Sequence, residues 1–193
     1  INKSQYHNEI EYFISELEIM KFCNNENIIK YIDDFEDDEN IYIVQEYLHG
    51  GDLYHFIRSQ ENLTERKIKN IIKQIANGLK YLHEHGIVHR DLKPQNIMVT
   101  ERSDMAKFKI TDFGFAKVLG YKEVVDDCLG TLNFSAPEVV LKLDYNNRVD
   151  VWSLGVMIYY MFFGVLPFES DTDVKLVKEI CTSKLIIPRG TRI

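Results

Sequence analysis

The sequence predicts an α+β fold, with a pair of strands early in the chain and most of the helices after it. Apolar residues recur every three or four positions over residues 8–23, which is typical of an amphipathic helix. Two segments rich in β-branched and aromatic residues, 31–32 and 41–47, are typical of strands. Helical periodicity then returns in 65–85 and again from residue 151. Such segregation of strands and helices along the chain indicates an α+β domain.

Composition and charge limit the function classes. The chain has 193 residues, of which 45% are hydrophobic, enough to bury a core as one domain or two small lobes. Its net charge of −7 gives no reason to expect a nucleic acid or an anionic membrane as a partner. Cys23, Cys128 and Cys181 form neither a disulfide framework nor a metal-ligand spacing, so we expect a reducing, cytoplasmic location. The chain starts without Met and without the apolar run of a secretory signal, and we expect a fragment.

In the first part of the chain, the helix over 8–23 is expected to bury one apolar stripe. Glu16 lies beside this stripe, on the opposite side of the helix from Ile14. The stripe consists of Ile10, Phe13, Ile14, Leu17 and Met20. The acidic segment 33–40 between the two strands lacks the Gly and Glu that an EF-hand loop starting at Asp34 requires. A solvated hairpin turn is therefore predicted there.

The middle of the chain is predicted to hold a short helix over 53–58 and then a long one. Thr64 is the expected N-cap of the long helix, and Gly86 is expected to end it. Its core stripe consists of Ile68, Ile71, Ile72, Ile75, Leu79 and Leu82. His83-Glu84-His85 lacks the further His that a metalloprotease helix needs at position 87, so it is interpreted as a solvated helix end.

In the second half, residues 97–99 and 108–110 are expected to pair as short strands. Residues 151–168 have no formal charge, a borderline length for a membrane span. Internal Ser, Gly and Pro residues and the lack of basic flanks favour a buried helix over 151–163 instead. A polar helix is expected over 174–180.

Residues 89–96, His-Arg-Asp-Leu-Lys-Pro-Gln-Asn, place three functional groups close together. Asp91 can accept or orient a hydroxyl proton, Lys93 can neutralise a phosphate oxygen, and Asn96 can hold a divalent ion through its carbonyl oxygen. A hydroxyl that attacks a phosphate ester needs these three kinds of group. The alternative is a turn that contains these letters by chance, against which the later motifs argue.

Those motifs are Asp112-Phe113-Gly114, Ala136-Pro137-Glu138 and Asp150-Val151-Trp152-Ser153-Leu154-Gly155. Together with residues 89–96, they resemble the H-R-D, D-F-G, A-P-E and D-x-W-S-x-G motifs of the eukaryotic protein kinases. The resemblance covers nearly the whole chain. It implies a protein-kinase-like two-lobe α+β fold, with an incomplete small lobe and hinge over 1–48. The mainly helical large lobe would cover 49–193 and be truncated after the helix near 174–180.

The resemblance also assigns roles in catalysis. Asp91 and Lys93 would act at the reacting groups, while Asn96 and Asp112 would hold Mg²⁺ against the phosphates of ATP. Asp150 would brace the backbone of the catalytic loop.

The resemblance also assigns nucleotide-binding residues, because residues 45–52 match the family's strand and the Gly-Gly connection after it without a gap. Gln45 matches the gatekeeper, and the backbones of Glu46 and Leu48 would hydrogen-bond adenine. Asp52 would face the ribose or a substrate arginine, and Met98 would pack under the adenine ring. For Leu48 and Met98, an ordinary core position is the alternative.

The activation segment shows one substitution of interest. Asp127 stands where many relatives have a phosphorylated Thr, and Arg90 and Lys117 would pair with it. Thr131 would contact the catalytic carboxylate. The alternative is that Asp127 and the adjacent Asp126 are solvated loop charges.

Parts of the family pattern are missing from the chain. It has neither the Gly-rich loop nor the strand lysine that precede the family's helix C. Glu16, eleven residues before Asn27, matches the helix-C glutamate, and Glu18 is the fallback. The later helices, one of which supplies an arginine that pairs with Glu138, are also missing. We therefore expect this fragment to be inactive in isolation.

The implied function is transfer of the ATP γ-phosphate to a serine or threonine of a protein substrate, with ATP and Mg²⁺ as cofactors. Lys93 and Thr131 match the serine/threonine class. Residues 155–160 and the following Leu-Pro-Phe resemble the calcium/calmodulin-dependent and calcium-dependent group, which suggests a calcium-linked regulator outside this chain. One alternative is a pseudokinase, a binding or scaffold module, but the three residues that such proteins lose are present. The other is a small-molecule kinase, against which the full activation segment argues.

Overall fold

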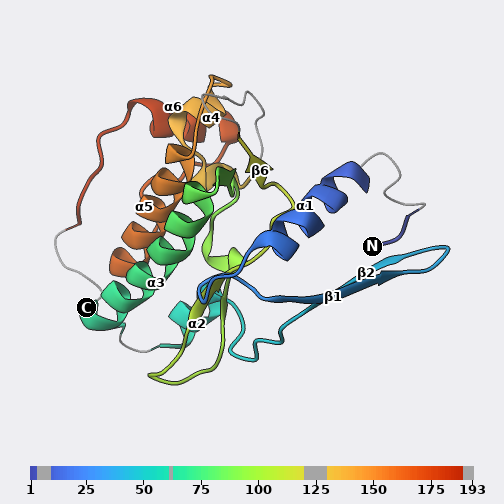
Figure 1. The fold of residues 1–193 in the computed structure, drawn as a ribbon. Coiled ribbons are helices and arrows are strands. Elements are labelled where there is room, and N and C mark those ends of the chain that lie inside the picture. The colour runs from blue at the N-terminus through green and yellow to red at the C-terminus, as the bar shows by residue number, and fades with distance from the viewer. Residues whose placement is uncertain (4–9, 61–62, 120–129, 189–193) are drawn as a thin grey trace.

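The computed structural model describes residues 1–3, 10–60, 63–119 and 130–188 (Figure 1). Its helices are α1 (Ile10–Phe22), α2 (Leu53–Ser59), α3 (Glu65–Glu84), α4 (Pro137–Val140), α5 (Arg148–Phe163) and α6 (Asp173–Thr182). Its strands are β1 (Tyr31–Glu36), β2 (Ile41–Gln45), β3 (Ile87–Val88), β4 (Ile97–Val99), β5 (Phe108–Ile110) and β6 (Lys117–Val118). The strands form three antiparallel pairs within the described residues, β1–β2, β3–β6 and β4–β5. The predicted α+β class is confirmed.

The elements divide into two groups in space. Figure 1 shows α1 and the β1–β2 hairpin on one side and the helices α3 and α5 on the other. The segment after α1 joins the groups, because the amide of Ile29 donates to the Ile110 carbonyl at 2.9 Å and the amide of Ile110 donates to the Asn27 carbonyl at 2.8 Å. The groups thus meet at β5, just before residue 112.

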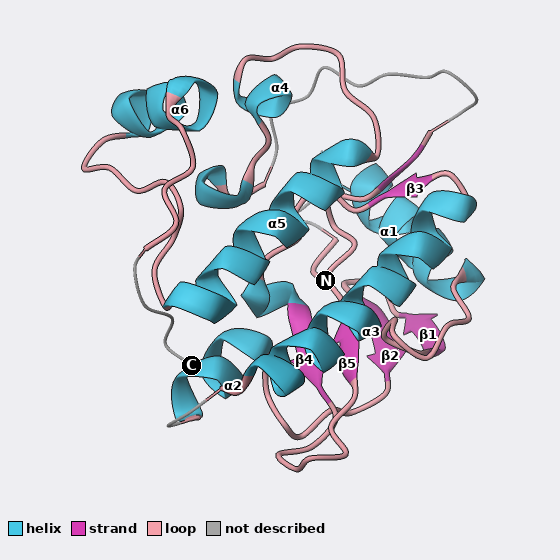
Figure 2. Ribbon diagram, turned by 90° about the vertical axis from the view of Figure 1, so that its left-hand side faces the viewer, coloured by secondary structure: helices cyan, strands magenta, loops and turns pink. Residues whose placement is uncertain are grey.

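Helix α3 is the main element of the larger group, and Figure 2 shows it beside α5. The Thr64 hydroxyl accepts a hydrogen bond from the Lys67 amide, which confirms the predicted cap. The predicted stripe is buried apart from Ile72, which is partly exposed. Each fully buried Ile or Leu contributes about 1.5–3 kcal/mol. Gly78 allows a close approach, because a Cβ there would lie 2.8 Å from the Asn27 carbonyl oxygen.

The predicted buried helix over 151–163 is confirmed only in part, because much of α5 is partly exposed and Val151 and Gly155 are exposed. Its buried residues are Val149, Asp150, Ser153, Val156, Met157 and Met161. Gly164 ends it with a left-handed backbone, φ 72°. Within the described ranges, no helix is long and apolar enough to cross a membrane. Strands β4 and β5 occupy the predicted residues, and their register pairs Met98 with Lys109.

Two predictions about the small group of elements were wrong. Ile14 of the predicted stripe is 47% exposed, whereas Met20 of the same stripe is buried together with Ile19, which the stripe did not include. The spacing of apolar residues predicts that a helix has an apolar side, but it does not predict which element packs against that side. Strand β1 continues to Glu36 through residues predicted as a turn, because an exposed strand tolerates acidic side chains while its backbone pairs with β2. Phe35 stacks on Tyr42 at 4.7 Å between ring centroids.

Candidate active site

The site is built around the carboxylate of Asp91, which is 4% exposed and lies just before the 3-10 turn Pro94–Asn96. Lys93 Nζ lies 2.7 Å from Asp91 Oδ2, and the Asn96 amide nitrogen donates to the same oxygen at 3.0 Å. The other oxygen, Oδ1, accepts from the Thr131 amide at 2.9 Å and from its hydroxyl at 3.0 Å. These donors contact both carboxylate oxygens and fix the orientation of the side chain.

The same contacts orient the amide of Asn96. Its nitrogen donates to the Asp91 backbone carbonyl at 2.8 Å as well, so the carbonyl oxygen is the end left for a cation. The Thr111 amide donates to the Asn96 backbone carbonyl at 3.0 Å, which brings Asn96 close to Asp112. The Asp112 side chain is exposed on a left-handed backbone, φ 65°. One carboxylate and one amide oxygen suit Mg²⁺, which takes few protein ligands and completes its shell with phosphates and water.

Asp150 holds the backbone before Asp91. It is fully buried, and its two oxygens accept from the amides of His89 and Arg90, both at 2.9 Å. Arg90 has a left-handed backbone, φ 69°, which is strained for a residue with a side chain. His83 on α3 also lies 2.8 Å from Asp150 Oδ2 through Nε2. The interpretation of residues 83–85 as a solvated helix end was therefore wrong for His83, which is 15% exposed.

Glu16 of α1 lies near Asp112. Burial raises its pKa above the ordinary value, the negative charge of Asp112 raises it further, and a hydrogen bond from the Phe113 amide opposes both effects. A Cβ on Gly114 would lie 3.4 Å from Asp112 Oδ1 and 3.6 Å from Glu16 Oε2. Next to this cluster, His89 and Phe113 are buried with ring centroids 5.4 Å apart. Glu18, the fallback, is exposed.

The residues of the expected nucleotide side lie at the junction of the two groups of elements. Gln45 ends β2, and its amide nitrogen lies 2.8 Å from Met20 Sδ on α1. Leu48 is buried, and Met98 is partly exposed. Asp52 forms an isolated bridge with Met98, and its carboxylate caps α2 by accepting from the His55 amide at 2.7 Å.

The activation segment is described only in part, and Asp126 and Asp127 lie outside the described residues. Lys117 pairs with Val88 between β6 and β3. The Arg90 guanidinium donates to the Phe115 carbonyl and lies 3.4 Å from the Tyr145 hydroxyl. The prediction that Arg90 and Lys117 bind Asp127 therefore stays a prediction.

Glu138 lies in the first turn of α4, and Lys142 after it has a left-handed backbone. Of the described cysteines, Cys23 and Cys181 are free thiols. Burial raises the pKa of the Cys23 thiol to about 11, so it remains protonated near neutral pH.

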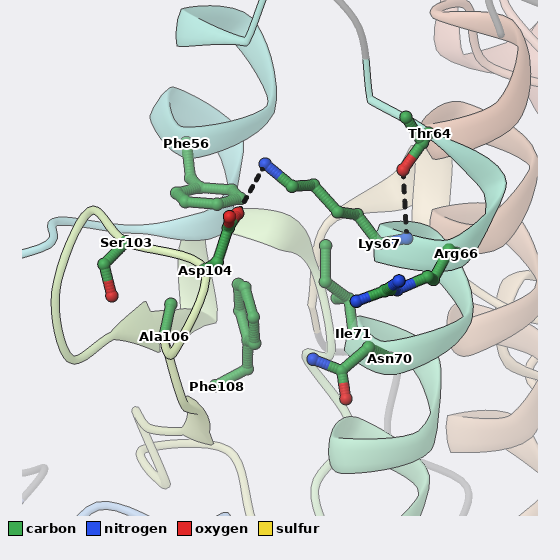
Figure 3. A pocket seen from close by; sticks show the side chains of 10 residues that line it. All are labelled: Phe56, Thr64, Arg66, Lys67, Asn70, Ile71, Ser103, Asp104, Ala106 and Phe108. Atoms are coloured by element: carbon green, nitrogen blue, oxygen red, sulfur yellow. Dashed lines mark hydrogen bonds and ion pairs between the residues drawn. The ribbon is translucent and has the colours of Figure 1, made fainter.

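A cavity of about 780 Å³ lies elsewhere, between α2, the start of α3 and the loop from β4 to β5. Figure 3 shows Lys67 pointing toward Asp104, at 2.9 Å, and the rings of Phe56 and Phe108 line the same cavity. Among the residues predicted from the sequence as site residues, none lines it. The cluster around Asp91 is thus separate from this cavity.

Sequence reasoning missed two side chains near the site. His83 falls four residues after Leu79, at the spacing of the buried stripe, and this phase was the available signal. Lys109, whose Nζ pairs with the Glu46 carboxylate, gave no signal in sequence, because its partner is 63 residues away.

Comparisons with known proteins agree with this geometry. The family model described as protein kinase domain matches residues 1–191. Over 179 residues, the chain is 36% identical to a probable myosin light chain kinase of Dictyostelium discoideum, covering 93% of this chain and 51% of that protein. It is 36% identical over 187 residues to serine/threonine-protein kinase H1 of Homo sapiens, covering 94% and 43%. It is 38% identical over 185 residues to serine/threonine-protein kinase ULK3 of Xenopus laevis, covering 95% and 39%.

The chain therefore belongs to the protein kinase family, and its α+β architecture is consistent with the two-lobe kinase fold. It spans about half, or less, of the length of these relatives.

Proposed function

We propose that the protein containing this chain transfers the γ-phosphate of ATP to serine or threonine hydroxyls of proteins. The observation that supports this most is the buried Asp91 carboxylate, fixed by Lys93, Asn96 and Thr131. Asp91 would orient the attacking hydroxyl, and Lys93 would neutralise a phosphate oxygen as charge moves. Asn96 and Asp112 would hold Mg²⁺, which neutralises the phosphates when bound.

In the nucleotide site, adenine would hydrogen-bond the backbones of Glu46 and Leu48 and pack over Met98. Gln45 would be the gatekeeper residue. Glu16 would bind the strand lysine that the family supplies from before helix C. The intact catalytic residues favour an enzyme over a pseudokinase.

Regulation by calcium is a finer proposal. It is supported by the likeness of residues 155–160 and 166–168 to the calcium/calmodulin-dependent and calcium-dependent kinases. A calcium-linked regulator would then bind outside this chain. A cytoplasmic location stays a prediction from the cysteine pattern.

Substrate choice provides the direct test of the function. We expect the Asp52 carboxylate to bind one substrate arginine. That arginine would have to displace the His55 ring, whose Nδ1 lies 2.8 Å from the Asp52 carboxylate. Gln95 and Lys178 are exposed where basophilic relatives often have acidic residues, and Lys178 would repel a second arginine. Full-length protein given MgATP and a positional peptide library is expected to phosphorylate serine and threonine peptides with one arginine preference. The absence of phosphate transfer contradicts the function, and strong selection for two adjacent arginines contradicts the substrate model.

Activation is expected to need no loop phosphate, because Asp127 supplies a permanent charge for Arg90 and Lys117. Full-length protein treated with phosphatase, with an unmodified loop verified by mass spectrometry, should keep its activity. Asp127→Ala should lower activity several-fold, whereas the neighbouring control Asp126→Ala should not. Loss of activity after phosphatase treatment, or full activity of Asp127→Ala, contradicts the prediction.

A further inference from the structure

The side chain of Glu46 makes two contacts that its expected backbone role does not explain. Its Oε1 accepts a hydrogen bond from the Lys30 amide at 2.7 Å and pairs with Lys109 Nζ at 2.5 Å. The Glu46 amide in turn donates to the Lys30 carbonyl at 3.0 Å. Glu46 is therefore hydrogen-bonded through its backbone and its side chain to Lys30, just before β1. Its side chain is also ion-paired with Lys109 of β5.

The ion pair joins the two sides of the expected nucleotide site. Lys109 is the register partner of Met98, and only Ile110 and Thr111 separate it from Asp112. Glu46 directly follows β2 on the other side. One salt bridge thus links the expected adenine-binding backbone to the strand that leads into the metal-binding carboxylate.

Burial distinguishes this pair from the ordinary surface pairs of the chain. The side chains of Lys109 and Glu46 are 12% and 23% exposed. Two residues away on the sequence, Lys107 pairs with Glu26 at 3.2 Å, but those side chains are 56% and 69% exposed. Solvent and salt screen an exposed pair, and such a pair contributes little, whereas a partly buried pair is screened less.

We propose that Glu46 and Lys109 form a positioning pair that sets the affinity for ATP. The pair holds the backbone of Glu46 at a fixed distance from Met98. Adenine can then hydrogen-bond the backbone and pack on the Met98 side chain at the same time. Neither side chain touches the reacting phosphate in this proposal. The proposal rests on the proposed function, because it takes this hinge to be the adenine site.

The test uses full-length protein and measures the ATP dissociation constant directly, together with kcat and both KM values. Lys109→Met keeps the aliphatic stem and removes the charge, and Glu46→Gln keeps the shape. Each is expected to weaken ATP binding by about five- to tenfold, with kcat at saturating ATP and the peptide KM within about twofold of wild type. Lys107→Met, the same change in an exposed pair, is the matched control and should leave ATP affinity unchanged.

Two further variants separate positioning from simple loss of stability. Lys109→Arg preserves the ion pair and should bind ATP with the wild-type affinity. The double variant Glu46→Gln/Lys109→Met should bind ATP about as weakly as either single variant, because both remove one interaction. A melting temperature measured without ATP reports any general loss of fold.

The outcomes distinguish the pair from the function on which it rests. Wild-type protein that binds no ATP contradicts the proposed function itself. Wild-type binding together with unchanged affinity in both single variants, or additive losses in the double variant, overturns the positioning pair alone. Equal losses in Lys107→Met and Lys109→Met also overturn it, because they assign the effect to charge in general.

Discussion

Asp91→Asn is expected to lower kcat by about 10²–10⁴-fold in the full-length protein, the range typical of a lost general base, and to leave ATP binding nearly unchanged. An amide places an N–H group where Lys93, Asn96 or Thr131 now donates to a carboxylate oxygen. The variant thus loses the proton acceptor and the fixed orientation together. Because Asp91 is proposed to act on the acceptor hydroxyl, the nucleotide site should remain intact.

Asp112→Asn should behave differently, because this carboxylate is expected to bind the metal rather than the hydroxyl. Turnover should fall at least as far, and Mg²⁺-dependent ATP binding should be lost with it. A thermal-shift titration with ATP and Mg²⁺ beside a phosphotransfer assay measures both effects, since a ligand that binds the folded state raises the melting temperature.

Asp104→Asn is the matched control for both variants, because Asp104 is an exposed loop residue paired with Lys67. It should retain wild-type turnover and ATP binding. Wild-type turnover by Asp91→Asn contradicts the proposed catalytic role. A normal ATP shift in Asp112→Asn with Mg²⁺ contradicts the metal assignment.

Local signals predicted the elements around the site well. Thr64 caps α3 by accepting a hydrogen bond from the amide of a residue three positions on, and β4 and β5 are short strands that pair close together in sequence. Asp91 and Asn96 are close in sequence, so one 3-10 turn suffices to bring their side chains together. Such features depend on spacing, which a sequence contains directly.

Features that depend on distant partners could not be predicted in this way. His83 contacts Asp150 across 67 positions, and Lys109 contacts Glu46 across 63. Ile14 has the periodicity of a core residue but is half exposed. In each case the deciding fact is which element packs against the side chain, and the periodicity of a helix or strand does not specify that neighbour.

Asp150→Ala is expected to lower the free energy of unfolding by about 3–5 kcal/mol, a large part of the stability of a typical domain. The carboxylate is fully buried and accepts from the buried amide of His89 and the partly buried amide of Arg90. Alanine leaves both amides without this acceptor, and each buried unpaired group costs about 1–3 kcal/mol. The left-handed backbone of Arg90 also loses the contact that holds it.

His83→Ala provides a graded comparison, because it removes only one contact and leaves both amides paired with Asp150. Its cost should be about 0.5–1.5 kcal/mol, the net value of a single hydrogen bond. Asp144→Ala, an exposed aspartate shortly before α5, is the matched control and should change stability by less than about 0.5 kcal/mol. Urea unfolding of the full-length proteins measures the three values. We expect the loss in the free energy of unfolding to be largest for Asp150→Ala, smaller for His83→Ala and smallest for Asp144→Ala, because the changes remove three, one and none of the contacts around Asp150. Equal stability of Asp150→Ala and Asp144→Ala contradicts the bracing role.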